Sequence, residues 1–178
     1  RLPRIYLGFR GPAYGRRAWY AADLLTATLS GGKSSRLFQD LVYNRQIAQD
    51  VGAYISPYEA GATFMVVATA RPGVAAEVLE QALIEHLDRA AGELPAPADL
   101  ERARNRMLTE HFTALQKLET RADVFSQLTT YFDDPGGINR EIEQYMDLDG
   151  RELRDFAAEF LVAGNRASLL FVPRESHP

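Results

Sequence analysis

The chain has no cysteine, which removes three kinds of chemistry at once. Without a thiol it can form no disulfide, no thiolate nucleophile and no cysteine-ligated zinc site. It also lacks any apolar run close to the roughly 18–20 residues that a helix needs to cross a bilayer, and residues 1–5 show no signal-peptide pattern. We therefore predict no membrane partner. The compartment stays open, with the bacterial periplasm or the cytoplasm as the expected sites.

An excess of basic charge is also missing. The 24 acidic residues outnumber the 20 basic ones, which gives a formal net charge of −4, and the arginines are spread along the chain. Because no basic field is available for a nucleic-acid backbone, we predict no nucleic-acid partner. The hydrophobic content of 46% suits one domain, predicted over residues 1–174 with a tail at 175–178. The chain opens into a strand pattern without an initiator methionine, so we expect it to be part of a longer protein.

Alternating and helical periodicities divide the chain into strands and helices. Ile5, Leu7 and Phe9 alternate with other residues, which is typical of a half-buried strand. Strands are predicted at 4–10, 51–57, 62–70 and 169–172, the middle two as a hairpin and the last as a buried strand. Helices are predicted at 16–29, 34–47, between 73 and 92, at 97–115, 118–132 and 138–146, and between 149 and 164. This order predicts an α+β fold, with one mostly antiparallel sheet covered on one face by helices.

Single residues in these helices carry more detailed expectations. Val78 and Phe112 belong to apolar stripes at helical spacing, so we expect both side chains to be buried. Asp149 is followed three residues later by Glu152, and this pair predicts a capping box that starts the last helix.

The three histidines do not form a zinc-peptidase motif. Such a helix needs two histidines four residues apart on one face, with a glutamate base beside them. The positions four residues before His86 and His111 hold Ala82 and Met107, and His177 lies in the predicted tail. We therefore predict no metal ligands, no cofactor and no catalytic residue in this chain.

The most specific stretch of the sequence is a run of two glycines, a lysine, two serines and an arginine: Gly31, Gly32, Lys33, Ser34, Ser35 and Arg36. One interpretation is a nucleotide-binding loop built on Gly32-Lys33-Ser34. That loop needs a glycine five positions before Gly32, where Ala27 stands, and a strand running into it, where the pattern is helical. The other interpretation is a structural turn, in which the glycines stop one helix and Ser34 begins the next. Spacing favours the turn.

The same stretch, with its surroundings, resembles a known family. Leu29-Ser30 leading into residues 31–36 and Leu37-Phe38, then Val51-Gly52-Ala53-Tyr54 and a hairpin, is similar to the non-catalytic, C-terminal half of pitrilysin- and insulinase-type zinc metallopeptidases, relatives of mitochondrial processing peptidase. The resemblance covers nearly the whole chain. It implies one α+β half of a clamshell that closes around an unfolded peptide, with zinc on the partner half only. It also implies that a sheet edge offers main-chain hydrogen bonds to the peptide.

The resemblance also suggests substrate-binding positions. Active relatives have an arginine shortly after the Ser-Ser-Arg-Leu segment and a tyrosine seven residues later; aligned on Leu41, these positions hold Val42 and Gln49. Valine carries no charge and donates no hydrogen bond, and glutamine offers only an amide. Either the pair is degenerate, which we favour, or Tyr43 and Arg45 take its place in a shifted register.

Two functions follow from the resemblance and one from the residues alone. The first is a non-catalytic half that binds peptide and needs a catalytic metallopeptidase half, on the same chain or on a separate subunit. The second is a degenerate scaffold or chaperone-like subunit without proteolysis, which the replacements at Val42 and Gln49 permit. The third is the disfavoured nucleotide-binding module. We expect a peptide substrate as the ligand and zinc on the partner half.

Overall fold

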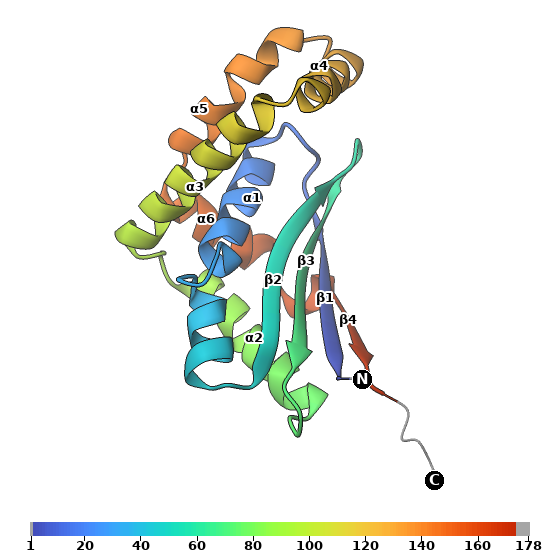
Figure 1. Cartoon of the computed structure of the whole chain (residues 1–178), viewed down its shortest axis with the longest axis vertical. Helices are drawn as coiled ribbons and strands as arrows, with labels where there is room; N and C mark the ends of the chain where they lie inside the picture. Colours follow the sequence, from blue (N-terminus) through green and yellow to red (C-terminus); the bar gives the residue numbers. More distant parts are fainter. Residues whose placement is uncertain (1, 174–178) are drawn as a thin grey trace.

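A four-stranded antiparallel sheet in the order β2-β3-β1-β4 carries helices on one of its faces (Figure 1). The computed structural model describes residues 2–173, so the predicted tail at 175–178 lies outside the described residues. The elements are β1 (Arg4–Gly11), α1 (Arg17–Ser30), η1 (Phe38–Asn44), β2 (Ala48–Pro57), β3 (Ala62–Ala70), α2 (Ala76–Gly92), α3 (Pro97–Leu115), α4 (Leu118–Phe132), η2 (Pro135–Asn139), α5 (Glu141–Met146), α6 (Gly150–Phe160), η3 (Ala163–Asn165) and β4 (Arg166–Phe171). The predicted α+β class and antiparallel sheet are confirmed.

The core forms where the inner face of the sheet meets the helices. Every second residue of β1 points inward, so Ile5 and Leu7 are fully buried. The neighbouring strand β3 adds Phe64, whose ring lies 5.7 Å from that of Phe156 on α6. Helix α2 buries Leu83 and its neighbours one turn away on the same face. The prediction that Val78 is buried is wrong: its side chain is 50% exposed, because the buried face of α2 runs through Ala76, Leu79 and Leu83 and leaves Val78 to one side.

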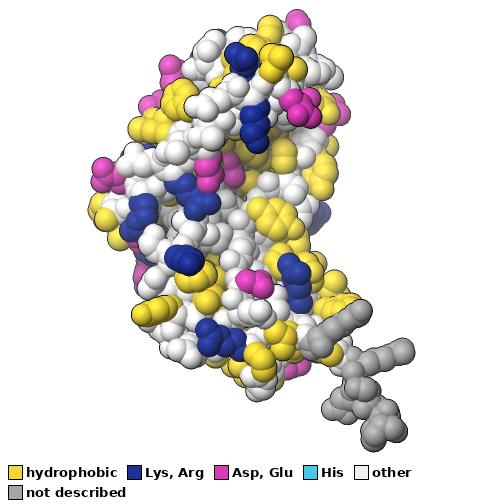
Figure 2. Space-filling model, in the orientation of Figure 1, with side chains coloured by type: hydrophobic (Ala, Val, Ile, Leu, Met, Phe, Trp, Pro, Cys, Tyr) yellow, Lys and Arg dark blue, Asp and Glu magenta, His cyan; other side chains and the backbone are white. Residues whose placement is uncertain are grey.

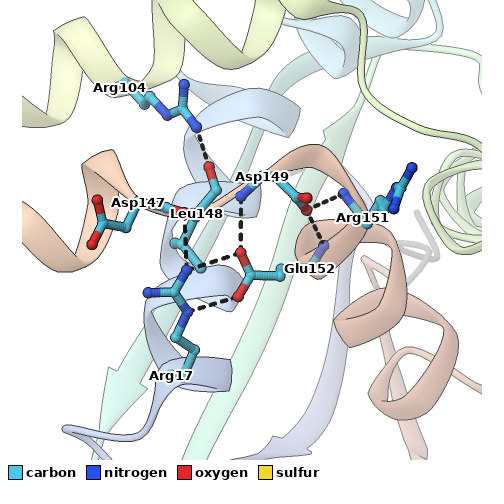
Figure 3. A network of polar contacts seen from close by, with 7 residues as sticks. All are labelled: Arg17, Arg104, Asp147, Leu148, Asp149, Arg151 and Glu152. Atoms are coloured by element: carbon cyan, nitrogen blue, oxygen red, sulfur yellow. Dashed lines mark hydrogen bonds and ion pairs between the residues drawn. The ribbon is translucent and has the colours of Figure 1, made fainter.

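The start of α6 is fixed by a network of charged side chains and backbone groups (Figure 3). Asp149 Oδ1 accepts hydrogen bonds from the backbone nitrogens of Arg151 and Glu152, and Glu152 Oε2 accepts one from the backbone nitrogen of Asp149. The predicted capping box is therefore confirmed. Arg17 of α1 binds both carboxylate oxygens of Glu152 at 2.7 and 3.0 Å and thereby ties α1 to α6. Its hydrogen bond holds the pKa of Glu152 below the usual value.

The second predicted helix, 34–47, differs from the observed structure. Residues 38–44 form a π-helix, and the chain leaves it through Gln46, whose φ is +53°. The backbone nitrogen of Arg45 bonds to the carbonyl oxygen of Asp40, five residues back, which is the wider π spacing. Strand β2 then starts at Ala48 instead of Val51. Pairing with β3 decides this boundary, because local propensity at residues 48–50 is weak for a strand.

The last strand was expected to be buried, and this expectation is wrong. β4 pairs only with β1 among the described strands, so it is an edge of the sheet. Leu169 and Phe171 are 61% and 55% exposed, because they point to the face of the sheet that no helix covers. Leu170 points to the other face and packs against the core.

Helices α3 and α4 form an arm that extends past the end of α1 toward the β2–β3 hairpin tip (Figure 1). In α3 only Leu100 and Ala103 are buried, both in its first half, and in α4 only Leu128 is. Phe112 is 58% exposed, so the prediction that it is buried is wrong. The helical spacing is correct, but in the second half of α3 the side that carries His111 faces α5 while Phe112 lies on a side that stays exposed.

Candidate functional site

The glycine turn at 31–36 joins α1 to the helical segment that leads into η1. The Gly31 nitrogen donates to the Ala27 carbonyl oxygen at 2.9 Å, and a Cβ on Gly31 would lie 2.2 Å from that same oxygen. Gly32 has φ +95°, a conformation that side-chain-bearing residues rarely adopt. Both glycines are therefore required by the backbone of the turn.

The rest of the turn packs against the start of α3. Arg102 donates to the Ser34 carbonyl oxygen at 3.2 Å, and Arg36 Nε lies 3.4 Å from Asp99 Oδ2. Ser35 is buried and Lys33 is exposed. A helix, not a strand, runs into the turn, so the strand–loop–helix context of a phosphate-binding loop is not formed here.

The four candidate substrate-binding residues lie around the connection between η1 and β2. Val42 is 9% exposed and belongs to the hydrophobic core. Arg45 points back to the helical layer, with Nη1 at 3.6 Å from Asp40 and 3.5 Å from Glu85. Tyr43 is 69% exposed. Gln49 is exposed at the start of β2, at an irregularity where Ala48 pairs with Ala70 and Asp50 with Thr69.

These positions are not brought together as one constellation. No hydrogen bond within residues 2–173 joins any two of the four side chains Val42, Tyr43, Arg45 and Gln49. Gln49 is the extra residue of a β-bulge, a device that re-aims side chains in sheets.

Arg71 holds this connection in place, a role that no sequence pattern indicates. It directly follows β3, and its guanidinium donates to the carbonyl oxygens of Val42 at 3.0 Å and Ala48 at 3.2 Å and to Oε1 of Gln46 at 3.2 Å. One arginine therefore fixes both ends of the segment from 42 to 48. A guanidinium suits this task because its donors are arranged in a rigid fork.

His86 of α2 forms a second polar contact at this segment. It is 5% exposed, and its Nε2 lies 2.8 Å from Asp40 Oδ2 on η1. His111 of α3 faces Glu141 at 3.9 Å. Each histidine thus faces one carboxylate, and residues 2–173 contain no group of three or more His, Cys, Asp or Glu side chains arranged to hold a metal ion. The described residues do not fit a zinc ion.

The side of the sheet that no helix covers, called here the open face, carries several apolar side chains. The outward-pointing residues of the four strands include Asp50, Thr63 and Thr69 and the less polar Tyr6, Gly8, Tyr54, Met65, Ala167, Leu169 and Phe171, whereas Val67 points the same way but is only 7% exposed. Gly8 and its neighbours line a depression of about 620 Å³ between β1, β3 and β4. Arg4 and Arg10 point to the same side. Sequence reasoning missed this surface, because alternation predicts two faces but not which one stays bare.

The two edges of the sheet differ in accessibility. Ser30, the last residue of α1, donates to the Ala53 carbonyl oxygen at 3.2 Å and accepts from the Ala53 nitrogen at 2.7 Å. The middle of β2 is therefore already capped by a side chain. Among the described strands, β2 and β4 each pair on one side only, and because the side chain of Ser30 occupies the middle of the β2 edge, the outer edge of β4 is the more open of the two to a further strand.

A buried polar cluster connects α1, and the loop before it, to α5. Tyr145 of α5 donates to Asp23 Oδ2 at 2.8 Å, and Tyr14 donates to Glu141 Oε1 at 2.7 Å. Burial raises the pKa of Asp23 to about 6, although the hydrogen bond from Tyr145 acts in the opposite direction. Burial also raises the pKa of Tyr20 to about 12.

Within residues 2–173, no helix combines the length and the apolar content that a membrane crossing requires.

Comparison with known proteins agrees with this architecture. Residues 1–107 match the sequence model of a family described as "Peptidase M16 inactive domain". The zinc protease PqqE of Helicobacter pylori is 25% identical over 89% of this chain and 36% of its own length. A Rickettsia bellii protein named as a zinc protease is 31% identical over 67% of this chain and 29% of its own length. The chain thus spans about a third of the length of these curated relatives.

Solved structures show the same fold. A protease from Helicobacter pylori superposes with a TM-score of 0.88 at 22% identity, over 97% of this chain and 41% of that one. An inactive peptidase domain from Bordetella parapertussis superposes with a TM-score of 0.88 at 22% identity, over 99% of this chain and 94% of that one.

Proposed function

The chain belongs to the family of peptidase M16 inactive domains, and from that membership we propose that it is the non-catalytic half of a zinc metallopeptidase. In this role it encloses and binds an unfolded peptide, while a catalytic half, on the same chain or on a separate subunit, holds the zinc. The zinc-protease names of the two curated relatives support a metal in the parent enzyme. No step of the reaction is assigned to a metal in this half, because its described residues do not fit one.

The observation that carries the proposal is the bare open face of the sheet. A large exposed apolar side chain is a common feature of binding surfaces, and here Leu169 and Phe171 on β4 stay 61% and 55% exposed, with Leu169 lining the same depression as Met65. An unfolded peptide presents apolar side chains and unpaired backbone groups together. The open face accepts the former, and the outer edge of β4 offers hydrogen bonds to the latter.

Backbone recognition of this kind explains why the site needs no array of charged side chains. Main-chain hydrogen bonds hold a peptide regardless of its sequence, and shallow apolar depressions add a modest preference. Gly8 points outward on the open face and has no side chain to fill such a depression. A Cβ at this position would lie 3.2 Å from Met65 Sδ.

A second candidate function is a scaffold or chaperone-like subunit without proteolysis, and one observation favours it. Val42 lies in the core, and Arg45 forms ion pairs with Asp40 and Glu85. Neither position therefore offers an unpaired positive charge to a bound peptide. We favour a degenerate pair at Val42 and Gln49. Peptide binding is common to both functions, and only cleavage by the assembled parent protein separates them.

The proposal is tested by peptide binding to two matched variants. Leu169 on the open face and Val78 on α2 are 61% and 50% exposed, so an aspartate at either position leaves the core intact. A fluorescently labelled, unfolded peptide is titrated into each protein and followed by anisotropy. We expect Leu169→Asp to weaken binding at least tenfold and Val78→Asp to leave it unchanged.

Two results would contradict the proposal. Equal affinity of the two variants would remove the open face from the binding site. Stoichiometric zinc binding by this chain in calorimetry, together with unaided peptide cleavage, would show that the chain is a catalytic half.

A further inference from the structure

A pocket at the tip of the β2–β3 hairpin leads to a second site, distinct from the open face. We propose that this hairpin-tip pocket, formed by Tyr14, Tyr58, Glu59, Gln127, Tyr131 and Phe132 next to Pro57, binds the basic side chain of an arginine or lysine. Its volume is about 160 Å³, which suits a single side chain and no larger element. The assignment of that side chain to a substrate peptide rests on the proposed function.

Three separate parts of the chain build the walls. Tyr14 comes from the loop between β1 and α1, Tyr58 and Glu59 from the hairpin tip, and Tyr131 and Phe132 from the end of α4. The arm and the sheet meet at this place, although they are far apart in the sequence. A pocket shared by the sheet and the arm is a common position for ligand sites.

The wall around Tyr14 is preorganised. Its hydroxyl donates to Glu141 at 2.7 Å, its ring centroid lies 4.7 Å from that of Trp19, and 5.6 Å separates it from the Phe132 ring. Burial and the hydrogen bond to Glu141 raise the pKa of Tyr14, so the phenol stays neutral at physiological pH. The ring is therefore held in place as an uncharged surface.

Two unusual backbone positions place Phe132 at the pocket. Gly15 has φ +84°, and a Cβ on it would lie 2.9 Å from the Phe132 ring, so only glycine lets this ring approach. Asp133, directly after Phe132, has φ +51° and ends α4 at this residue. A left-handed residue commonly ends a helix, so this conformation of Asp133 fixes where α4 stops and thereby where the Phe132 ring lies.

The chemistry of the lining points to a cation. The faces of tyrosine and phenylalanine rings attract lysine and arginine side chains, and a carboxylate adds a direct charge interaction. The lining offers four aromatic residues and the carboxylate of Glu59, and none of its described members is basic. Tyr58 and Tyr131 are 60% and 55% exposed, so two of the rings can be reached from solvent. An anionic side chain would face Glu59 and be repelled.

The test has two parts, one with a small probe and one with peptides. In the first, Nα-acetyl-arginine methylamide and its norleucine counterpart are titrated into the protein while aromatic NMR signals are followed. In the second, two labelled peptides that differ only by arginine or norleucine at one position are compared by anisotropy. We expect saturable shifts of the Tyr58 and Tyr131 ring signals with the arginine probe only. We also expect about three- to thirtyfold tighter binding of the arginine peptide.

Three variants test whether the preference for arginine arises in the hairpin-tip pocket. Tyr131→Leu and Glu59→Gln each change an exposed lining residue and should reduce the preference for arginine. Phe125→Leu, also exposed on α4 but outside the lining, is the matched control and should keep the preference.

The outcomes separate this inference from the proposed function. If both peptides bind equally well, the pocket inference is wrong and peptide binding stands. If the arginine probe shifts the pocket signals while neither peptide binds, the pocket takes basic side chains and the proposed peptide-binding function is wrong. If Phe125→Leu abolishes the preference as fully as Tyr131→Leu does, the preference does not arise in the pocket.

Discussion

The two ends of this molecule bury their apolar residues to very different degrees. At the sheet end, Leu7 and Leu83 are fully buried between the inner face and the helical layer. In the arm, Phe112, Leu118 and Phe125 are 58%, 74% and 43% exposed, and Figure 2 shows hydrophobic side chains at the surface of this end of the molecule. The difference separates residues that hold the fold together from residues that are available for contacts. The open face and the hairpin-tip pocket draw on the second group.

The largest expected effect on stability comes from shortening a buried side chain at the sheet end. Leu83→Ala removes a fully buried side chain, so we expect it to lower the free energy of unfolding by about 2–5 kcal/mol. Phe112→Ala, in the exposed half of α3, should cost less than about 1 kcal/mol. Urea unfolding followed by circular dichroism measures both. Equal losses would show that the arm is as tightly packed as the core.

The second prediction concerns the glycine turn at 31–36, which follows α1 and packs against the start of α3. Gly31→Ala places a Cβ 2.2 Å from the Ala27 carbonyl oxygen, so the turn must distort, at a cost of about 2–3 kcal/mol. Gly52→Ala is the control, because a Cβ there meets nothing within 4 Å, and we expect a change within about 0.5 kcal/mol. A stable Gly31→Ala protein would mean that the turn adapts freely and does not hold α1 against α3.

Asp23, the carboxylate of α1 that is hydrogen-bonded to Tyr145 of α5, makes the free energy of unfolding depend on pH. The pKa of Asp23 is about 6 in the folded protein against an ordinary value of 3.8, so the folded state binds the proton more tightly than the unfolded state. Stability should therefore fall as pH rises from about 4 to 6 and then level off, by roughly 1–2 kcal/mol for this group. Tyr145, Glu141 and Glu110 act on the pKa of Asp23 from the neighbouring helices.

Asp23→Asn isolates this contribution. Denaturant unfolding between pH 4 and 7.5 should show a smaller fall for the variant than for the wild type, while the opposite contribution of Glu152, whose pKa is lowered, is common to both. Parallel curves for the two proteins would rule out Asp23 as the source.

The smallest expected effect is at Arg71. Arg71→Lys keeps the charge but cannot reach the carbonyl oxygens of Val42 and Ala48 and the Gln46 side chain together, so we expect a loss of about 1 kcal/mol. Arg89→Lys, in the last turn of α2, is the control and should change stability by less than about 0.5 kcal/mol. An Arg71→Lys protein as stable as the wild type would mean that residues 42–48 keep their conformation without the guanidinium hydrogen bonds.

Much of the fold was readable from local sequence patterns. The alternation at Ile5, Leu7 and Phe9 and the capping box of Asp149 and Glu152 act within a few residues, and both predictions are confirmed. The wrong expectations concern burial that depends on distant elements. Phe112 has the right spacing but no neighbour to cover it, and β4 has an apolar composition but lies at an edge. The π-helix at 38–44 stands where the sequence predicted an α-helix, and no local pattern indicates its wider spacing.

The candidate site was less readable. The sequence identified the positions Val42, Tyr43, Arg45 and Gln49, but it could not show that Val42 faces the core or that Arg45 is held by two carboxylates. Arg71 and the aromatic residues of the hairpin-tip pocket come from separate elements, so only the folded chain brings them together.

Site-specific photo-crosslinking tests the central claim most directly. A benzoylphenylalanine is placed at Met65 on the open face or at Val78 on the helical side, and each protein is irradiated with an unfolded peptide. The account predicts peptide adducts from position 65 that an excess of unlabelled peptide suppresses, and none from position 78. Adducts from position 78 alone, or equal labelling at both positions, would contradict it.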